Sequence, residues 1–118
     1  MPQGKICYVE IPANDVDASA RFYEIVFGWK TRSRGDGQRA FDDATGAVSG
    51  TWVLGRSPQP EPGLLTYVMV DSIDATLGEI STAGGRVASP KTAIGSSGSY
   101  FATFHDPAGN LLGLYQGP

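Results

Sequence analysis

The chain has 118 residues, of which 41% are hydrophobic and 18% are charged, and its formal net charge is −3. This length fits one compact domain with a sizeable core, and the composition is that of an ordinary globular protein. A nucleic-acid binder needs a basic surface to neutralise phosphates, so the negative charge argues against that class. The N-terminus has no apolar segment of the signal-peptide type, and no apolar run is long enough to span a membrane. We therefore expect a cytoplasmic protein without a membrane partner.

The first half of the chain predicts one helix and four strands in the order β-α-β-β-β. The helix is indicated by an apolar stripe with helical spacing, formed by Val16, Ala20, Tyr23 and Phe27. Asn14 or Asp15 is the expected N-cap, and Gly28 is expected to end the helix in the left-handed conformation. Strands are expected at residues 6–12, 29–34, 38–41 and 47–54, with a turn at residues 35–37 between the second and the third.

The second half predicts the same order after a stiff, proline-rich linker at residues 58–63. A helix is expected at residues 73–83, with Asp71 or Ser72 as its N-cap and Gly84-Gly85 at its end. Strands are expected at residues 64–70, 86–88, 99–104 and 111–116, with a loop through residues 95–98 and a turn at residues 105–110. The chain therefore contains two copies of one pattern.

The two halves also match residue by residue, which indicates an internal duplication. Around the helices, Val16-Asp17-Ala18 corresponds to Ile73-Asp74-Ala75. Around the last hairpin of each half, the matched pairs are Phe41 with Phe104, Gly50 with Gly113 and Trp52 with Tyr115. We predict a single domain, residues 1–118, built from one module at residues 4–57, the linker, and a second module at residues 64–118.

Three segments carry a resemblance to a known family: IPANDVDASARFYEIVFGWK, YVMVDSIDATLGEISTAGGRV and FHDPAGNLLGLYQ. They resemble the vicinal oxygen chelate superfamily, which includes glyoxalase I, bleomycin-resistance proteins, fosfomycin-resistance enzymes and extradiol dioxygenases. The resemblance implies an α+β fold in which two tandem βαβββ modules form a U-shaped half-barrel with the helices outside. It also implies that a ligand binds on the concave side. One such scaffold hosts several unrelated reactions, so the resemblance does not fix the chemistry.

The resemblance further implies where a metal would bind. Family members that use a metal place a His or Glu on the first and on the fourth strand of each module. The matching positions in this chain are Tyr8, Gly50, Leu65 and Gly113. Such a set lacks the nitrogen and carboxylate donors that hold a divalent cation. The only histidine, His105, is expected to lie exposed in a turn, and no second histidine could share a metal with it. We expect neither a metal nor another cofactor.

Strand alternation predicts which side chains line the concave side. The candidate ligand-binding residues are Tyr8, Glu10, Val48, Gly50, Trp52, Leu65, Tyr67, Met69, Leu111, Gly113 and Tyr115. Their aromatic rings would stack on a flat or aromatic molecule, and two glycines at matched positions would leave room for it. The alternative is that these aromatic side chains fill a core. Glu10, the carboxylate of the set, is the candidate catalytic residue.

Three functions remain open at this point. The first is metal-independent binding of a small, aromatic or flat molecule. The alternative is a glyoxalase-like lyase or isomerase, with a metal bound in an unusual way or with Glu10 and a tyrosine as the acid–base pair. The third is a structural or protein-interaction role, which would need no cavity. We expect a homodimer in each case, because two small modules leave open sheet edges and related proteins commonly dimerise.

Overall fold

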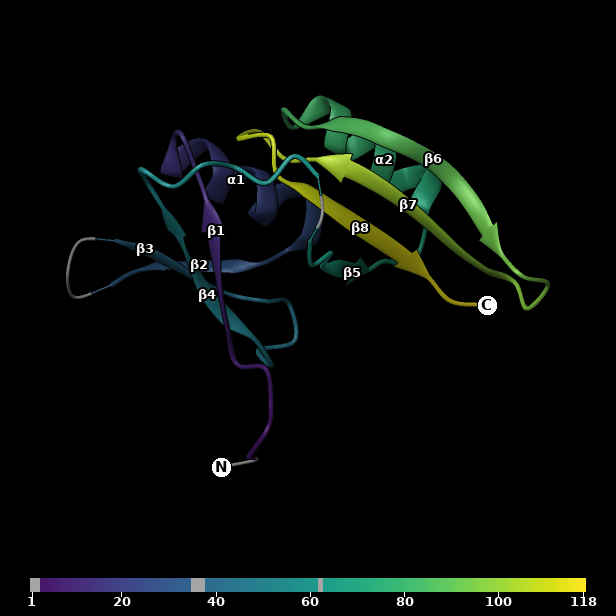
Figure 1. Ribbon diagram of the computed structural model, residues 1–118, viewed down its shortest axis with the longest axis horizontal. Coiled ribbons are helices and arrows are strands. Elements are labelled where there is room, and N and C mark those ends of the chain that lie inside the picture. The colour runs from purple at the N-terminus through teal and green to yellow at the C-terminus, as the bar shows by residue number, and fades with distance from the viewer. Residues whose placement is uncertain (1–2, 35–37, 62) are drawn as a thin grey trace.

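The computed structural model describes residues 3–34, 38–61 and 63–118, and the turn predicted at residues 35–37 lies outside them (Figure 1). Module one contains β1 (Tyr8–Pro12), α1 (Val16–Phe27), β2 (Lys30–Ser33), β3 (Arg39–Asp42) and β4 (Ser49–Val53). Module two contains β5 (Tyr67–Met69), α2 (Ile73–Thr82), β6 (Arg86–Ile94), β7 (Ser99–His105) and β8 (Leu111–Gln116). Among the described residues, neither helix has the length and apolar character needed to cross a membrane.

Each module forms its own four-stranded sheet. The strand order is β1-β4-β3-β2 in module one and β5-β8-β7-β6 in module two. The first strand of each module runs parallel to the fourth, and the other neighbours are antiparallel. The predicted α+β class with two tandem βαβββ modules is confirmed. Figure 1 shows the two sheets side by side, with a helix packed on one face of each.

Both helices begin at residues that the sequence marked, and α1 also ends at one, whereas α2 ends one residue earlier than predicted, with Ala83 as its C-cap. Asp15 caps α1 by accepting a hydrogen bond from the Ala18 amide at 3.1 Å. Ser72 caps α2 in the same way through the Ala75 amide at 3.2 Å. Gly28 takes the left-handed conformation, with φ of 69°, and thereby ends α1 without the steric cost that a side chain would add.

The strand β6 is much longer than predicted. The sequence suggested a strand at residues 86–88, and two residues further on Pro90 lacks the amide that a central strand must donate. In the structure β6 continues to Ile94 along the edge of the sheet. Its pairing with β7 shifts register between Val87 and Ser89 and again between Ser89 and Thr92. Pro90 is accommodated within this irregular edge, where a missing donor costs little.

The register of β4 differs by one residue from the predicted one. The prediction aligned Gly50 with Gly113, but Gly50 pairs with Phe41 in module one whereas Leu112 pairs with Phe104 in module two. The hairpin before β4 is therefore one residue longer than its counterpart before β8. A shift of one residue moves every side chain of a strand to the opposite face of the sheet.

Two assignments to the concave face are therefore wrong. Trp52 is fully buried, and its ring packs 6.0 Å from Tyr23 of α1 and 4.9 Å from Phe41. It belongs to the core beneath the helix. Gly50 lies on this same helix-facing side, opposite Phe41 in the neighbouring strand.

The two glycines also do not leave space for a ligand. A Cβ atom at Gly50 would collide with the Val9 carbonyl oxygen and the Phe41 ring. A Cβ atom at Gly113 would lie 2.5 Å from the Tyr67 ring. Each glycine therefore allows an aromatic ring to lie directly against the backbone, and the room that the sequence suggested is already filled.

We predict that alanine is tolerated very differently at these two positions. Gly50→Ala forces a clash with backbone in a buried strand, and we expect it to lower the free energy of unfolding by about 3 kcal/mol or more. Gly113→Ala displaces the ring of Tyr67, which is 48% exposed and can rotate towards solvent. We therefore expect this variant to lower the free energy of unfolding by only about 1 kcal/mol. Urea unfolding of both variants checks this. Equal costs at the two positions would contradict the register given above.

Candidate functional site

A buried polar junction joins the two modules. The Tyr23 hydroxyl, on α1, donates a hydrogen bond of 2.9 Å to Asp106 Oδ2, which lies in the turn between β7 and β8. Asp106 is only 3% exposed. Its Oδ1 accepts hydrogen bonds from the backbone amides of Ala108, Gly109 and Asn110. Burying a carboxylate is costly, and here the cost is offset because these donors replace the hydrogen bonds that water would make to it.

Asn110 extends the junction to the rest of module one and to the linker. Its side-chain amide donates to the Pro12 carbonyl at the end of β1, at 2.7 Å, and to Asp106 Oδ2 at 3.0 Å. Its Oδ1 accepts a hydrogen bond of 2.9 Å from the Gln59 amide. The turn at residues 105–110 was predicted from its proline and glycine alone, and its role in joining the modules comes from the structure.

Apolar packing reinforces the junction. Phe22 and Phe27 of α1 pack with their ring centroids 6.0 and 5.8 Å from that of Phe104 in β7. The two modules therefore share one hydrophobic core, and α1 contributes to both sides of it.

The junction predicts how stability depends on pH. Burial raises the pKa of Tyr23 well above its usual 10.0, and the charge of Asp106 and the hydrogen bond to it act in the same direction. The folded state thus favours the protonated phenol. The stabilisation is complete below pH 10, where the unfolded tyrosine is also protonated, and is lost as the pH rises further and the unfolded tyrosine ionises.

We therefore expect the free energy of unfolding to fall above pH 10, with Tyr23 contributing about 1.4 kcal/mol per pH unit. In Tyr23→Phe this contribution should be absent, although the variant should be less stable at pH 8 by about 1–2 kcal/mol because Asp106 loses a donor. Urea unfolding of both proteins between pH 8 and pH 11 gives the comparison. Parallel pH profiles would show that Tyr23 titrates alike in the folded and unfolded states.

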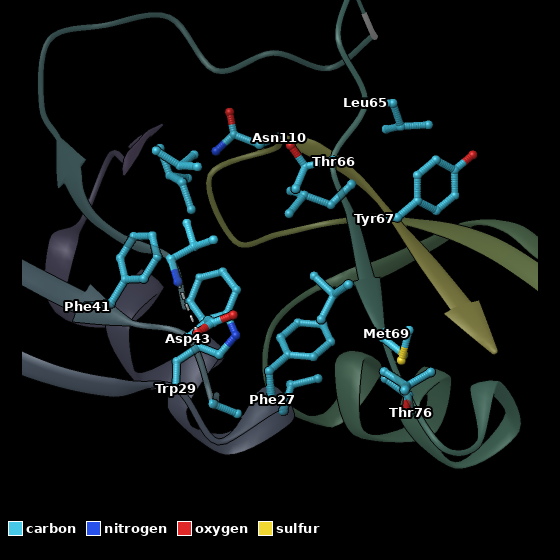
Figure 2. A pocket seen from close by; sticks show the side chains of 18 of the residues that line it. Phe27, Trp29, Phe41, Asp43, Leu65, Thr66, Tyr67, Met69, Thr76 and Asn110 are labelled. Atoms are coloured by element: carbon cyan, nitrogen blue, oxygen red, sulfur yellow. Dashed lines mark hydrogen bonds between the residues drawn. The ribbon is translucent and has the colours of Figure 1, made fainter. Parts of the chain in front are cut away.

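A cavity of about 1030 Å³ lies between the two modules. The free edge strands β1 and β5 both contribute to it. Its walls are mainly apolar and include Ile6, Val9, Ile11, Val26, Phe27, Trp29, Phe41, Val68, Val70 and Leu112. Figure 2 shows Phe27, Trp29 and Phe41 on one side and Leu65, Tyr67 and Met69 on the other.

The cavity contains about half of the residues that the sequence proposed. Glu10, Val48, Leu65, Tyr67, Met69 and Leu111 line it. Gly113 and Tyr115 lie on the same face of module two as Tyr67 and Met69, but they belong to the open side of the sheet. A second, shallower depression of about 510 Å³ lies there, lined by Tyr67, Ile94, Phe101 and Tyr115. Tyr8, which is 46% exposed, lines neither hollow.

The aromatic wall of the cavity was not predicted from the sequence, because its residues have the pattern of core positions. Phe27, Trp29 and Phe41 follow the apolar pattern of buried positions, and the rings of Trp29 and Phe41 are stacked 4.6 Å apart. Val9 and Val68 likewise point to the helix-facing side of their strands. These side chains form a cavity wall only because β1 and β5 are not paired with each other. The separation of two strands cannot be predicted from the periodicity within either of them.

Glu10, the candidate catalytic residue, forms an ion pair. Its Oε1 accepts a hydrogen bond of 2.8 Å from Arg56, and both side chains are about half exposed. Glu10 belongs to β1 and is one of the residues that line the cavity. An exposed pair of this kind contributes little to stability, so it does not explain why the two residues are there.

The residues at the family's metal positions do not fit a metal ion. With the corrected register the four positions are Tyr8, Thr51, Leu65 and Gly113. Thr51 is buried and donates its hydroxyl to the Arg39 carbonyl. Residues 3–34, 38–61 and 63–118 contain no group of three His, Cys, Asp or Glu side chains placed to share a metal ion. Divalent transition metals need such nitrogen, sulfur or carboxylate donors together.

His105 is not the exposed turn residue that the sequence suggested. It is the last residue of β7 and is partly buried. Its Nε2 lies 3.2 Å from the Pro60 carbonyl oxygen, so the ring contacts the linker. The contact gives this histidine a position beside the junction rather than in the cavity.

Comparisons with known proteins agree with this fold. The sequence profile of the Glyoxalase/Bleomycin resistance protein/Dioxygenase superfamily matches residues 5–114. A "Glyoxylase-like domain-containing protein" of Didymella fabae is 31% identical over 98% of this chain and 95% of its own length. A relative from Mycobacterium bovis is 30% identical over 97% of this chain, which spans only 46% of that relative.

Solved structures show the same architecture. A glyoxalase/bleomycin resistance protein/dioxygenase family enzyme from Burkholderia phytofirmans has a TM-score of 0.80 and 20% identity, covering 98% of this chain and all of its own. The fosfomycin resistance protein FosX from Listeria monocytogenes has a TM-score of 0.79 and 19% identity, covering 100% of this chain and 94% of its own. At these identities the likeness establishes the fold alone.

Proposed function

Because the chain belongs to the Glyoxalase/Bleomycin resistance protein/Dioxygenase superfamily, we propose that it binds a small apolar molecule, aromatic or flat, without a metal ion. The observation that carries the proposal is the cavity between the modules, whose walls are aromatic and aliphatic. Its volume of about 1030 Å³ is at the upper end of what small-molecule sites occupy. The family's metal positions, which hold Tyr8, Thr51, Leu65 and Gly113, support the metal-independent part.

The aromatic wall suits a flat ligand. Trp29 and Phe41 are stacked on each other at 4.6 Å, and Phe27 lies 6.0 Å from Trp29. Trp29 and Phe27 are only partly buried, so they keep surface on which another ring can pack. Aromatic contacts of this kind stabilise a complex through buried area and through offset or edge-to-face geometry.

The second candidate function is that of a glyoxalase-like lyase or isomerase. It is favoured by the description of the Didymella relative as glyoxylase-like and by the Glu10 carboxylate at the cavity. In that case the bound compound would be converted to product, and Glu10→Gln would abolish turnover while leaving binding intact. Binding without turnover favours the first function.

We further propose that the chain acts as a homodimer. The edge strands β1 and β5 carry free backbone groups, and apolar side chains near them, such as Ile6, Leu64 and Met69, are more than 70% exposed. Pairing with a second copy would satisfy these edges and cover the apolar surface. Sedimentation equilibrium that finds a single chain at high protein concentration would contradict this.

The binding proposal predicts that filling the cavity blocks the ligand. Ala75, on α2, is exposed and lines the cavity, so Ala75→Phe should occupy space there without disturbing the core. We expect the affinity for 2-naphthylmethanol, used as a flat apolar probe, to fall at least about tenfold, because the ring would overlap the bound probe. Isothermal titration calorimetry measures the affinity.

The matched control is Ser81→Phe. Ser81 is exposed on the same helix but does not line the cavity, so this variant adds the same side chain elsewhere. It should bind the probe as the parent does. If both variants, or neither, weaken binding, the probe does not bind in the cavity.

A further inference from the structure

The charged residues of the cavity are all acidic. Among the described residues that line it, the ionisable carboxylates are Glu10, Asp43, Asp71 and Glu79, and neither a lysine nor an arginine is present. Two of them come from module one, one lies just before α2 and one lies on α2. A cavity whose walls are apolar and whose charges have one sign creates a field that favours one sign of ligand.

Asp43 is held as an ionised group on the aromatic side. Burial alone would raise its pKa, but hydrogen bonds from the Thr45 hydroxyl and from the amides of Val48 and Ala47 outweigh that effect, and the net pKa lies below its usual value. Figure 2 shows Asp43 on the same side of the cavity as Phe41 and Trp29. A fixed negative charge and aromatic faces therefore occur together.

Asp71 and Glu79 face the cavity from module two. Asp71 precedes the N-cap of α2, and Glu79 lies in the last turn of this helix. Within the part of the chain that the structure describes, neither carboxylate forms an ion pair, whereas Asp74 of the same helix is paired with Lys91 at 3.1 Å. Glu10 is neutralised in part by Arg56. Three of the four carboxylates thus keep their charge available at the cavity.

Carboxylates and aromatic faces are the two groups that proteins use to bind organic cations. A cation is attracted to the negative face of Trp, Tyr or Phe within about 6 Å of the ring centre. The attraction between opposite charges is stronger beside an apolar wall than in bulk water. Phe27, Trp29 and Tyr67, which are partly or largely exposed, line the same cavity as the acidic residues.

We propose that the ligand of the inter-module cavity is an apolar molecule that carries a positive charge, such as an aromatic or alkyl amine. The inference rests on the proposed function, because it assigns the charge of the molecule that the cavity binds. The apolar walls hold the body of the ligand, and the acidic residues and aromatic rings hold its ammonium group. An anionic compound of the same shape is repelled.

Three probes of one shape test the charge directly. They are 2-naphthylmethylammonium, 2-naphthylmethanol and 2-naphthoate, titrated calorimetrically at pH 7. We expect the cation to bind about tenfold more tightly than the alcohol, and the anion to bind most weakly. Two or three partly hydrated carboxylates would produce a difference in affinity of this size. The advantage of the cation should shrink as salt is raised, because salt screens these charges.

The double variant Asp71→Asn/Glu79→Gln locates the effect. It should reduce the affinity for the cation about fivefold and leave the affinity for the alcohol unchanged. The control is Glu61→Gln, which removes one exposed charge from the linker outside the cavity, and which should change neither affinity. A far-ultraviolet circular dichroism spectrum identical to that of the parent establishes that each variant is folded.

The outcomes separate this inference from the proposed function. If the alcohol binds and Ala75→Phe blocks it, but the three probes bind equally or the anion binds best, the cavity binds a ligand and the assignment of its charge is wrong. If no probe binds, the proposed function is overturned, and the inference with it. A cation that binds equally well to the double variant contradicts the role of α2.

Discussion

The arrangement of the molecule depends on one buried carboxylate. Asp106 accepts hydrogen bonds from three backbone amides, from the Asn110 side chain and from the Tyr23 hydroxyl of the other module. Each donor offsets part of the cost of removing the charge from water, and the loss of any one would remove part of that compensation. Asn110 then ties the end of β1 and the linker to the same point. These contacts determine how the two modules face each other.

The cavity follows from that arrangement. The junction and the Phe22, Phe27 and Phe104 packing join the modules at α1 and at the turn between β7 and β8. Among the described residues the two sheets are not paired with each other, and β1 and β5 each remain an edge. Side chains that the helices would otherwise cover, such as Val9 and Val68, are left partly exposed between the modules. An apolar hollow of this size attracts either a ligand or a second copy of the chain.

The acidic residues of the cavity bear on which molecule can occupy it. A purely apolar cavity would accept any molecule of suitable shape, whereas we propose that Asp43, Asp71 and Glu79, which line this one, make it select by charge. The family's metal positions in this chain have side chains that are apolar, hydroxylic or absent. The fold is therefore shared with the superfamily, and we propose that a ligand binds between the modules without a metal ion.

The sequence was sufficient for the elements and for the duplication. Capping residues and helical periodicity located both helices to within a few residues, because these are local signals, and β8 was placed without error. Three failures have physical causes of longer range. The extra residue before β4 turned Trp52 to the opposite face of the sheet from the predicted one. The edge position of β6 allowed this strand to continue past Pro90. The space expected at Gly50 and Gly113 is filled by neighbouring rings and backbone. Each of these features depends on contacts with a neighbouring strand, which local sequence patterns do not predict.

The candidate site was only partly predictable for the same reason. Alternation along β5 correctly grouped Tyr67 and Met69 on one face, since alternation is a property of a single strand. The wall formed by Phe27, Trp29 and Phe41 depends on how far apart the modules lie, and that distance is set by the Asp106 junction. No periodicity in the chain encodes it.

The metal content of the purified, untagged protein tests the metal-independent site most directly. The protein is incubated with Mn²⁺, Ni²⁺, Zn²⁺ or Fe²⁺, desalted and analysed by mass spectrometry of its elements. We expect far less than one retained ion per chain, because Tyr8, Thr51, Leu65 and Gly113 offer no adequate donor set. Retention of close to one ion per chain would contradict this, and would make a metal-dependent lyase or dioxygenase the favoured function.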